Sequence, residues 1–162
     1  VVTLIWDPNM AIIEVCFPGA EGKNDPHFTG FDGSSYDFKG SPNAVFNLIT
    51  DTNFQLNTML IKSPVDGRTY MGSLGLRVGA NRVYVDPQRV SLNGELLSEG
   101  DYALPDGDAN AGVIFVSTDS VSIHTDAYNL EISTVHWKRN MTHLNFQSSV
   151  NSRFITDPHG IL

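Results

Sequence analysis

The 162-residue chain contains a single cysteine and no long apolar segment. With Cys16 alone, the chain cannot close a disulfide bond within itself, so its stability must come from a hydrophobic core. A chain of this length buries roughly 70% of its extended surface on folding, which is enough for one domain without a disulfide or a structural metal. No apolar run approaches the roughly 18 residues of a membrane-spanning helix, so we expect no membrane insertion.

Basic residues are also scarce. The chain has 10 Lys and Arg residues against 18 Asp and Glu residues, which gives a net charge of -8 at pH 7. A protein with this charge repels the phosphate backbone of nucleic acids. We therefore expect no nucleic-acid partner.

The sequence also lacks helical periodicity, since no segment keeps a 3.6-residue apolar repeat over three turns. Apolar residues instead alternate with polar ones, as in half-buried strands. This alternation predicts that Phe54, Leu56, Thr58 and Leu60 share one inner face. Asn93-Gly94 lies between two apolar segments and favours a two-residue hairpin turn. These patterns predict an all-β fold, an antiparallel β-sandwich of meandering hairpins with little helix.

A connector rich in Gly and Pro, at residues 18–24, divides the chain into two parts. Residues 1–23 comprise N-terminal strands and this connector, and residues 24–162 form the β domain. Within the β domain, residues 98–112 are predicted to form an acidic loop. The aromatic and aliphatic residues expected in the core include Phe28, Phe31, Phe38, Phe46, Leu56, Leu74 and Ile123.

The stretch from Asp25 to Gly40 combines turn residues, acidic groups and aromatic residues in one short run. Its motifs are Asp25-Pro26-His27-Phe28, Phe31-Asp32-Gly33 and Tyr36-Asp37-Phe38-Lys39-Gly40. Asp32-Gly33 supplies a turn that tolerates positive φ, and Tyr36 and Phe38 share one face of an extended segment. The stretch therefore predicts a β-hairpin that opens the β domain.

These motifs resemble the opening of a von Willebrand factor type D domain. Leu92-Asn93-Gly94 and the closing His159-Gly160-Ile161-Leu162 are similar to the related C-terminal domain of inter-alpha-trypsin inhibitor heavy chains. Residues 57–61 and 72–76 resemble plant root-cap proteins. The resemblance covers about residues 24 to 162. It implies a module of a larger extracellular protein, although the cysteine-rich pattern usual in type D domains is missing.

Calcium is the metal that the sequence favours, because hard cations take carboxylate and carbonyl oxygens and the turns of this chain are rich in Asp and Asn. The resemblance implies that Asp32 binds calcium together with an Asn/Asp loop. That loop would begin after Leu162, so the family site is expected to be incomplete in this chain.

A second candidate calcium site is formed by Asp106, Asp108 and Asn110, whose alternating oxygens begin like an EF-hand loop. Ala111 stands where an EF-hand has Gly, and Ser117 stands where it has Glu. A solvated acidic turn is therefore the competing interpretation.

No catalytic residue is assigned, and we expect no enzyme. His27 could act as a general base or ligand, or it could be a structural hydrogen-bonding residue. The other histidines considered, His124, His136 and His143, do not have the spacing of a zinc-ligand pair. The chain also lacks the Gly-x-Ser-x-Gly motif of a nucleophilic serine.

Self-cleavage at Asp25-Pro26 is an alternative function. Some mucin-type relatives cut themselves within Gly-Asp-Pro-His, and Asn24-Asp25-Pro26-His27 keeps three of these four residues. The Asp25 carboxyl could attack its own carbonyl while His27 relays a proton. However, Asn24 replaces the Gly that would permit an unusual backbone approach. We therefore expect the bond to stay intact at neutral pH.

Asn140-Met141-Thr142 is an N-glycosylation sequon, which is consistent with a secreted or surface protein. A glycan at Asn140 is expected to keep the neighbouring sheet edge from pairing with another strand.

We interpret the chain as a non-catalytic structural or adhesive module of a larger extracellular or cell-surface protein. Its expected partners are other extracellular proteins, glycans or further copies of itself. A carbohydrate-binding module with exposed aromatic platforms is a further alternative. The aromatic residues considered as anchors for partners are Tyr70, Tyr84, Tyr102, Tyr128 and Trp137.

Overall fold

The computed structural model describes residues 19–105, 112–151, 160 and 162, and its regular structure is almost entirely β-strand. In chain order the elements are β1 (Ala20–Lys23), β2 (His27–Thr29), β3 (Ser35–Asp37), β4 (Val45–Asp51), β5 (Phe54–Lys62), β6 (Thr69–Val78), β7 (Asn81–Asp86), β8 (Arg89–Leu92), β9 (Glu95–Leu97), β10 (Gly100–Ala103), β11 (Val113–Val116), β12 (Ser120–His124), β13 (Tyr128–His136), η1 (Lys138–Asn140) and β14 (Thr142–Val150). The predicted all-β fold with little helix is confirmed, since the only helix among the described residues is the short 3-10 helix η1. No helix in this part of the chain is long and apolar enough to cross a membrane. Cys16 and the strands predicted before residue 18 lie outside the described residues.

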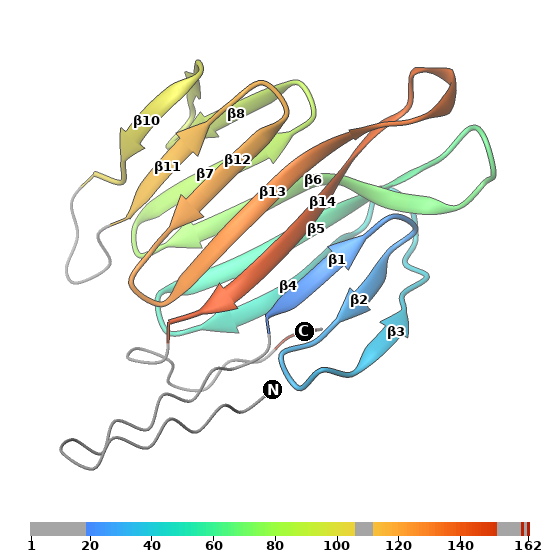
Figure 1. Ribbon diagram of the computed structural model, residues 1–162, viewed down its shortest axis with the longest axis horizontal. Helices are drawn as coiled ribbons and strands as arrows, with labels where there is room; N and C mark the ends of the chain where they lie inside the picture. Colours follow the sequence, from blue (N-terminus) through green and yellow to red (C-terminus); the bar gives the residue numbers. More distant parts are fainter. Residues whose placement is uncertain (1–18, 106–111, 152–159, 161) are drawn as a thin grey trace, which may run out of the picture.

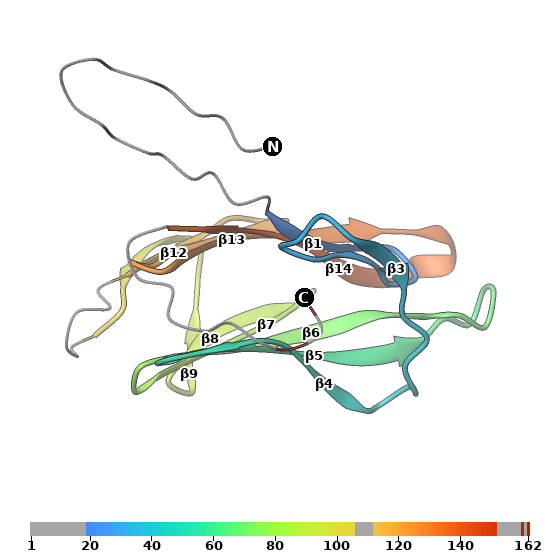
Figure 2. The same ribbon diagram turned by 90° about the horizontal axis from the view of Figure 1, so that it is seen from below.

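The 14 strands form one continuous antiparallel sheet that folds over into two layers (Figures 1 and 2). The first layer, called here the β13 layer, has the order β3-β2-β1-β14-β13-β12-β11-β10. The second, called the β7 layer, has the order β4-β5-β6-β7-β8-β9. The layers join where Leu144 of β14 pairs with Met71 of β6. The predicted sandwich is therefore inexact in one detail, because its two layers are parts of a single sheet.

The core lies between the layers and is built from alternate residues of facing strands. Phe54, Leu56, Thr58 and Leu60 of β5 are all buried, as their alternation predicts. Phe54 stacks on Tyr128 of the opposite layer, with ring centroids 4.1 Å apart. The largest fully buried side chains are Tyr128, Phe28, Phe54, Phe146, Leu48, Ile49, Leu56, Leu60, Met71, Leu74, Ile114 and Ile123.

The predicted core is correct in part. The fully buried members are Phe28, Leu56, Leu74 and Ile123. The prediction is wrong for three residues that are only half-buried and pack against the edge of the core, Phe31, Phe38 and Phe46. Phe46 lies opposite the buried Thr58 and so faces the core side, but β4 is the edge strand of its layer and pairs only with β5. A β-bulge between Asn47 and Ile49 turns both Leu48 and Ile49 into the core.

The Asn93-Gly94 turn joins β8 to β9 as predicted, with Leu92 opposite Glu95. Both turn residues have positive φ, 53° at Asn93 and 92° at Gly94, as in the turn type that matches strand twist. Two short strands depart from the predicted pattern, because β1 lies within the expected connector and β10 within the expected acidic loop. β1 is inserted between β2 and β14, so these connector residues are part of the sheet.

Candidate functional site

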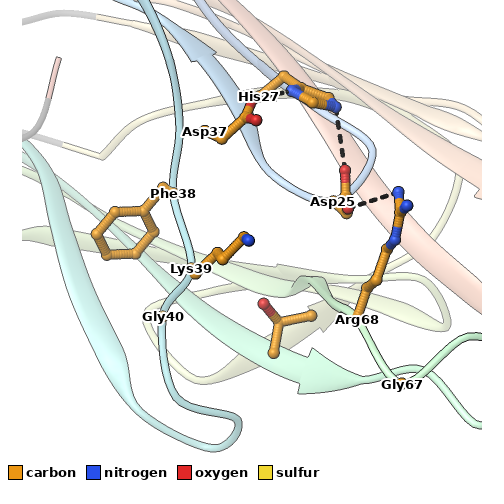
Figure 3. A pocket seen from close by; sticks show the side chains of 9 residues that line it. Asp25, His27, Asp37, Phe38, Lys39, Gly40, Gly67 and Arg68 are labelled. Carbon is orange, nitrogen blue, oxygen red and sulfur yellow. Dashed lines mark hydrogen bonds and ion pairs between the residues drawn. The ribbon is translucent and has the colours of Figure 1, made fainter.

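The candidate site lies at the open end of the β2–β3 hairpin, where Asp25, His27 and Asp37 come together (Figure 3). Asn24 follows β1 with a φ of 55°, and its backbone N–H donates to Asn145 Oδ1 at 2.9 Å. This turn directs the chain into β2. The register of the hairpin then sets His27 directly opposite Asp37.

Ion pairs connect these residues to the turn between β5 and β6. His27 Nε2 lies 3.0 Å from Asp25 Oδ1, and His27 Nδ1 is in close contact with the Asp37 carboxylate. Arg68 Nη1 lies 2.8 Å from Asp25 Oδ2. Both carboxylate oxygens of Asp25 and both ring nitrogens of His27 are therefore engaged. We call these four residues the Asp25 network.

A third carboxylate, that of Asp66, extends the network into the β7 layer. Arg68 Nε lies 3.8 Å from Asp66 Oδ2, and the Tyr70 hydroxyl donates a hydrogen bond to the same oxygen at 2.9 Å. Burial of Tyr70, the hydrogen bond to Asp66 and the charge of that carboxylate raise the pKa of Tyr70 to about 12. The hydroxyl therefore stays protonated near neutral pH and remains a donor.

A surface hollow of about 550 Å³ adjoins the network. It is lined by Asp25, His27, Asp37, Phe38, Lys39, Gly40, Gly67, Arg68 and Thr69 (Figure 3). The side chains of His27 and Arg68 are 56% and 62% exposed, so water weakens the electrostatic interactions that they make. Because the acids and the imidazole bond to one another, the arrangement is suited to holding the hairpin in place.

The Phe31-Asp32-Gly33 motif forms the closed end of the same hairpin, so the structure does not bring Asp32 together with Asp25 and His27. Gly33 has a φ of 80°, as the predicted turn requires. Asp32 Oδ1 accepts hydrogen bonds from the hydroxyl and the backbone N–H of Ser34, at 2.6 and 2.8 Å. The hydroxyl bond and then the backbone bond lower the pKa of Asp32.

Sequence comparison agrees with the order of these motifs. The profile of the von Willebrand factor type D domain family matches residues 20–160. The chain belongs to this family. The match contains the Asp25 network, the Asp32 turn and β1. A search of curated proteins found no match to the chain.

In this type D domain, a calcium site at Asp32 stays a prediction. One oxygen of Asp32 is held by Ser34, and calcium takes six to eight oxygen ligands. Within residues 19–105 and 112–151, no group of three or more His, Cys, Asp or Glu side chains is placed to hold a metal ion. The alternative ligands Asp106, Asp108 and Asn110 lie outside the described residues.

Asn140 of the sequon is exposed in η1, at the tip of the hairpin that joins β13 to β14. Both strands have neighbours on either side within the sheet. Next to the tip, however, residues 135–136 and 142–143 pair only with one another, so the expectation that a glycan would protect a sheet edge stays a prediction. A glycan at Asn140 would project from the tip of the hairpin.

The aromatic residues considered as anchors differ in exposure. Tyr70 and Tyr128 are buried in the core, which excludes them as surface anchors. Tyr84, Tyr102 and Trp137 are half-buried. An exposed aromatic residue that sequence reasoning missed is Phe115 on β11, which alternates with the buried Ile114 and Val116 and is 37% exposed.

Sequence reasoning also missed two members of the Asp25 network. Asp37 could have been found by counting outward from the Asp32-Gly33 turn, because the hairpin register pairs it with His27. No local pattern points to Arg68, which reaches Asp25 only because the turn before β6 lies beside the open end of the hairpin.

Proposed function

We propose that this type D domain is a non-catalytic structural or adhesive module of a larger extracellular or cell-surface protein, where it contacts other proteins or glycans. Von Willebrand type D domains are typically modules of larger extracellular proteins. The observation that supports the non-catalytic role is the Asp25 network. Its acids and its imidazole bond to one another, which favours a role in fixing the hairpin to the rest of the fold.

The network is expected to contribute modestly to stability. Exposed ion pairs are worth about 0.2–1 kcal/mol each, because solvent screens them and ordering the side chains costs entropy. Asp25 is the central member, since it pairs with His27 on one side and Arg68 on the other. Its loss should therefore affect both pairs.

A double-mutant cycle on Asp25 and Arg68 tests this role. We expect Asp25→Asn and Arg68→Gln each to lower the free energy of unfolding in urea by up to about 1 kcal/mol, and the double variant to lose less than the sum. Lys62→Gln is the matched control, because Lys62 is exposed at the end of β5. The network would not be stabilising if each single variant lost no more stability than Lys62→Gln and the double variant lost the sum of the two.

The extracellular setting is supported by the family and by the exposed sequon at Asn140. We expect the protein made through the secretory pathway of eukaryotic cells to carry a glycan there. Peptide N-glycosidase F should reduce its mass, and Thr142→Ala should abolish the difference. A secreted wild-type protein without any such mass difference would remove this support.

Self-cleavage at Asp25-Pro26 is the second candidate, and two observations favour it. His27 contacts the Asp25 carboxylate, and Asn24 adopts the positive φ that the Gly of the mucin motif would favour. In this reaction an Asp25 carboxylate oxygen bonds to its own backbone carbonyl carbon and the bond to the Pro26 nitrogen breaks. The nitrogen takes a proton from His27, and water then opens the anhydride. Arg68 opposes this step by holding Asp25 Oδ2.

Asn24→Gly separates the two candidates, because it completes the Gly-Asp-Pro-His motif. If the site cleaves itself, this variant should accumulate fragments that end at Asp25 and begin at Pro26. If the network is structural, Asn24→Gly should remain intact with little change in stability, because glycine readily adopts the positive φ of this position.

A further inference from the structure

The outer face of the β7 layer carries a cross-strand pair of arginines. Arg77 on β6 and Arg82 on β7 are directly opposite in the antiparallel register, and both are exposed. Their neighbours Leu76 and Val83 are buried, so both arginines point away from the core. Side chains in such a pair start about 5 Å apart, and like charges placed this way repel.

Neither guanidinium has an ion pair or a hydrogen bond to another side chain in the part of the chain that the structure describes. This is unexpected in a protein with 18 acidic residues. Asp86, an acid of the same layer, is occupied by Arg89, whose Nε lies 3.0 Å from Asp86 Oδ2. The repulsion between Arg77 and Arg82 is therefore not relieved by any carboxylate of the described residues.

The arginine pair continues into a row of polar side chains across the sheet. Gln55 is paired with Arg77, and Thr50 is paired with Gln55. We call Thr50, Gln55, Arg77 and Arg82 the arginine row. The row runs over β4, β5, β6 and β7 and offers the amide of Gln55 and the two guanidinium groups as donors, whereas the Thr50 hydroxyl already donates to Asn47 Oδ1 at 2.9 Å.

A second line of paired residues runs beside this row, and the glycine in it leaves the surface flat. Asn57, Gly75 and Tyr84 are paired in register, and a Cβ atom added to Gly75 would meet no other atom within 4 Å. The guanidinium carbon of Arg89 lies 5.3 Å from the centre of the Tyr84 ring. This face is therefore open and positively charged, with an aromatic ring beside the row.

We propose that the arginine row binds a sulfated polysaccharide. The planar guanidinium fork matches an oxyanion such as sulfate and bonds it through two parallel N–H groups. An extended chain with repeated sulfates can lie across a flat sheet and neutralise both arginines at once. The net negative charge of the rest of the domain is screened beyond about 8 Å at physiological ionic strength, so it does not prevent such local binding.

The choice of a sulfated glycan over another polyanion rests on the proposed extracellular setting. The proposal that the arginine row binds anions is independent of that setting. The two can fail separately. A protein that binds heparin but receives no glycan at Asn140 would keep the row and weaken the extracellular role. A protein that carries a glycan at Asn140 but does not bind heparin would support the extracellular role and contradict the proposal for the arginine row.

Binding of heparin oligosaccharides to the intact protein, measured at low and physiological salt, tests the proposal. We expect Arg77→Gln/Arg82→Gln to weaken binding about tenfold, since two exposed ionic contacts are lost. Lys62→Gln/Lys138→Gln removes the same charge from remote exposed positions and should change the affinity less than about twofold. The arginine variant should fold normally, because the substitutions relieve a like-charge contact.

Equal weakening by both double variants would overturn the proposal, because binding would then follow net charge alone. Unchanged binding by the arginine variant would overturn it as well. Desulfated heparin should not bind, and double-stranded DNA and polyglutamate should bind more weakly than heparin. Equal binding of either would contradict the assignment to sulfated glycans.

Discussion

His143 is buried in β14, and among the described residues neither of its ring nitrogens has a hydrogen-bond partner. It is 1% exposed, and its ring packs 4.7 Å from that of Tyr70, beside the point where Leu144 joins the two layers. Burial lowers the pKa of His143 from its ordinary value of 6.5. The neutral imidazole is therefore the form that this site holds.

We predict that stability falls as the pH drops below about 6.5, the ordinary pKa of a histidine. In the window between the lowered folded pKa and 6.5, the unfolded chain binds a proton at His143 that the folded chain does not. Stability is therefore complete above this window and is lost as pH falls through it. The melting temperature, measured from pH 7.5 to pH 5, should fall more steeply for the wild type than for His143→Phe. Parallel curves would contradict this account of His143.

Asp32 gives a prediction about calcium. Because Ser34 holds one of its oxygens and the described residues add no acidic cluster, we expect weak calcium binding or none, and any binding should require Asp32. Titration calorimetry on the wild type and Asp32→Ala measures this directly. Tight binding that survives the substitution would instead point to Asp106, Asp108 and Asn110.

At the scale of elements, the opening hairpin is held mainly by Phe28. This ring is fully buried and packs with Phe146 against the backbone of Gly22, where an added Cβ would lie 2.6 and 2.8 Å from the two rings. Phe31, at the turn of the same hairpin, is only half-buried. The two phenylalanines should therefore differ in their contribution to stability.

We predict that Phe28→Ala lowers the free energy of unfolding by about 3–5 kcal/mol, as for other fully buried aromatic residues. Phe31→Ala should cost clearly less, because part of its ring already contacts water. Urea unfolding followed by tryptophan fluorescence measures both. A larger loss for Phe31→Ala would mean that the turn, rather than β2, anchors the hairpin.

The strands that could be predicted are those whose own sequence alternates. Residues 54–60 and the Asn93-Gly94 turn carry a local signal, and the structure follows it. Residues 20–23 and 100–103 carry no such signal. β1 is held partly by β14, which is distant in sequence, and β10 pairs with β11 across residues 104–112. Leu48 and Ile49 show a third case, in which a β-bulge in β4 breaks the alternation so that two successive residues are buried.

At the scale of the whole molecule, only the site residues that lie within one short sequence motif could be predicted. The opening motif identified Asp25 and His27, but their contact with Arg68 depends on how the hairpin of the β13 layer meets the turn of the β7 layer. The arginine row could be predicted only in part, because Arg77 and Arg82 flank the short turn between β6 and β7, whereas Thr50 and Gln55 join them only through the register of β4, β5 and β6.

The continuity of the sheet from β14 to β6 also means that the two layers should unfold together. Both layers contribute to one core, in which Phe54 and Tyr128 stack across the interior. The Asp25 network adds a polar connection between the layers at the molecule's surface. We therefore assign the network a structural role rather than a role in self-cleavage.

The measurement that tests this assignment most directly is the intact mass of the protein after incubation at mildly acidic and neutral pH, alongside His27→Ala. We predict that the wild type keeps the mass of the uncleaved chain in both conditions, while His27→Ala also stays intact and melts at a slightly lower temperature. Selective cleavage after Asp25, sparing Asp86-Pro87 and the other Asp-Pro bonds and abolished by His27→Ala, would contradict it. That result would make the domain a self-processing module.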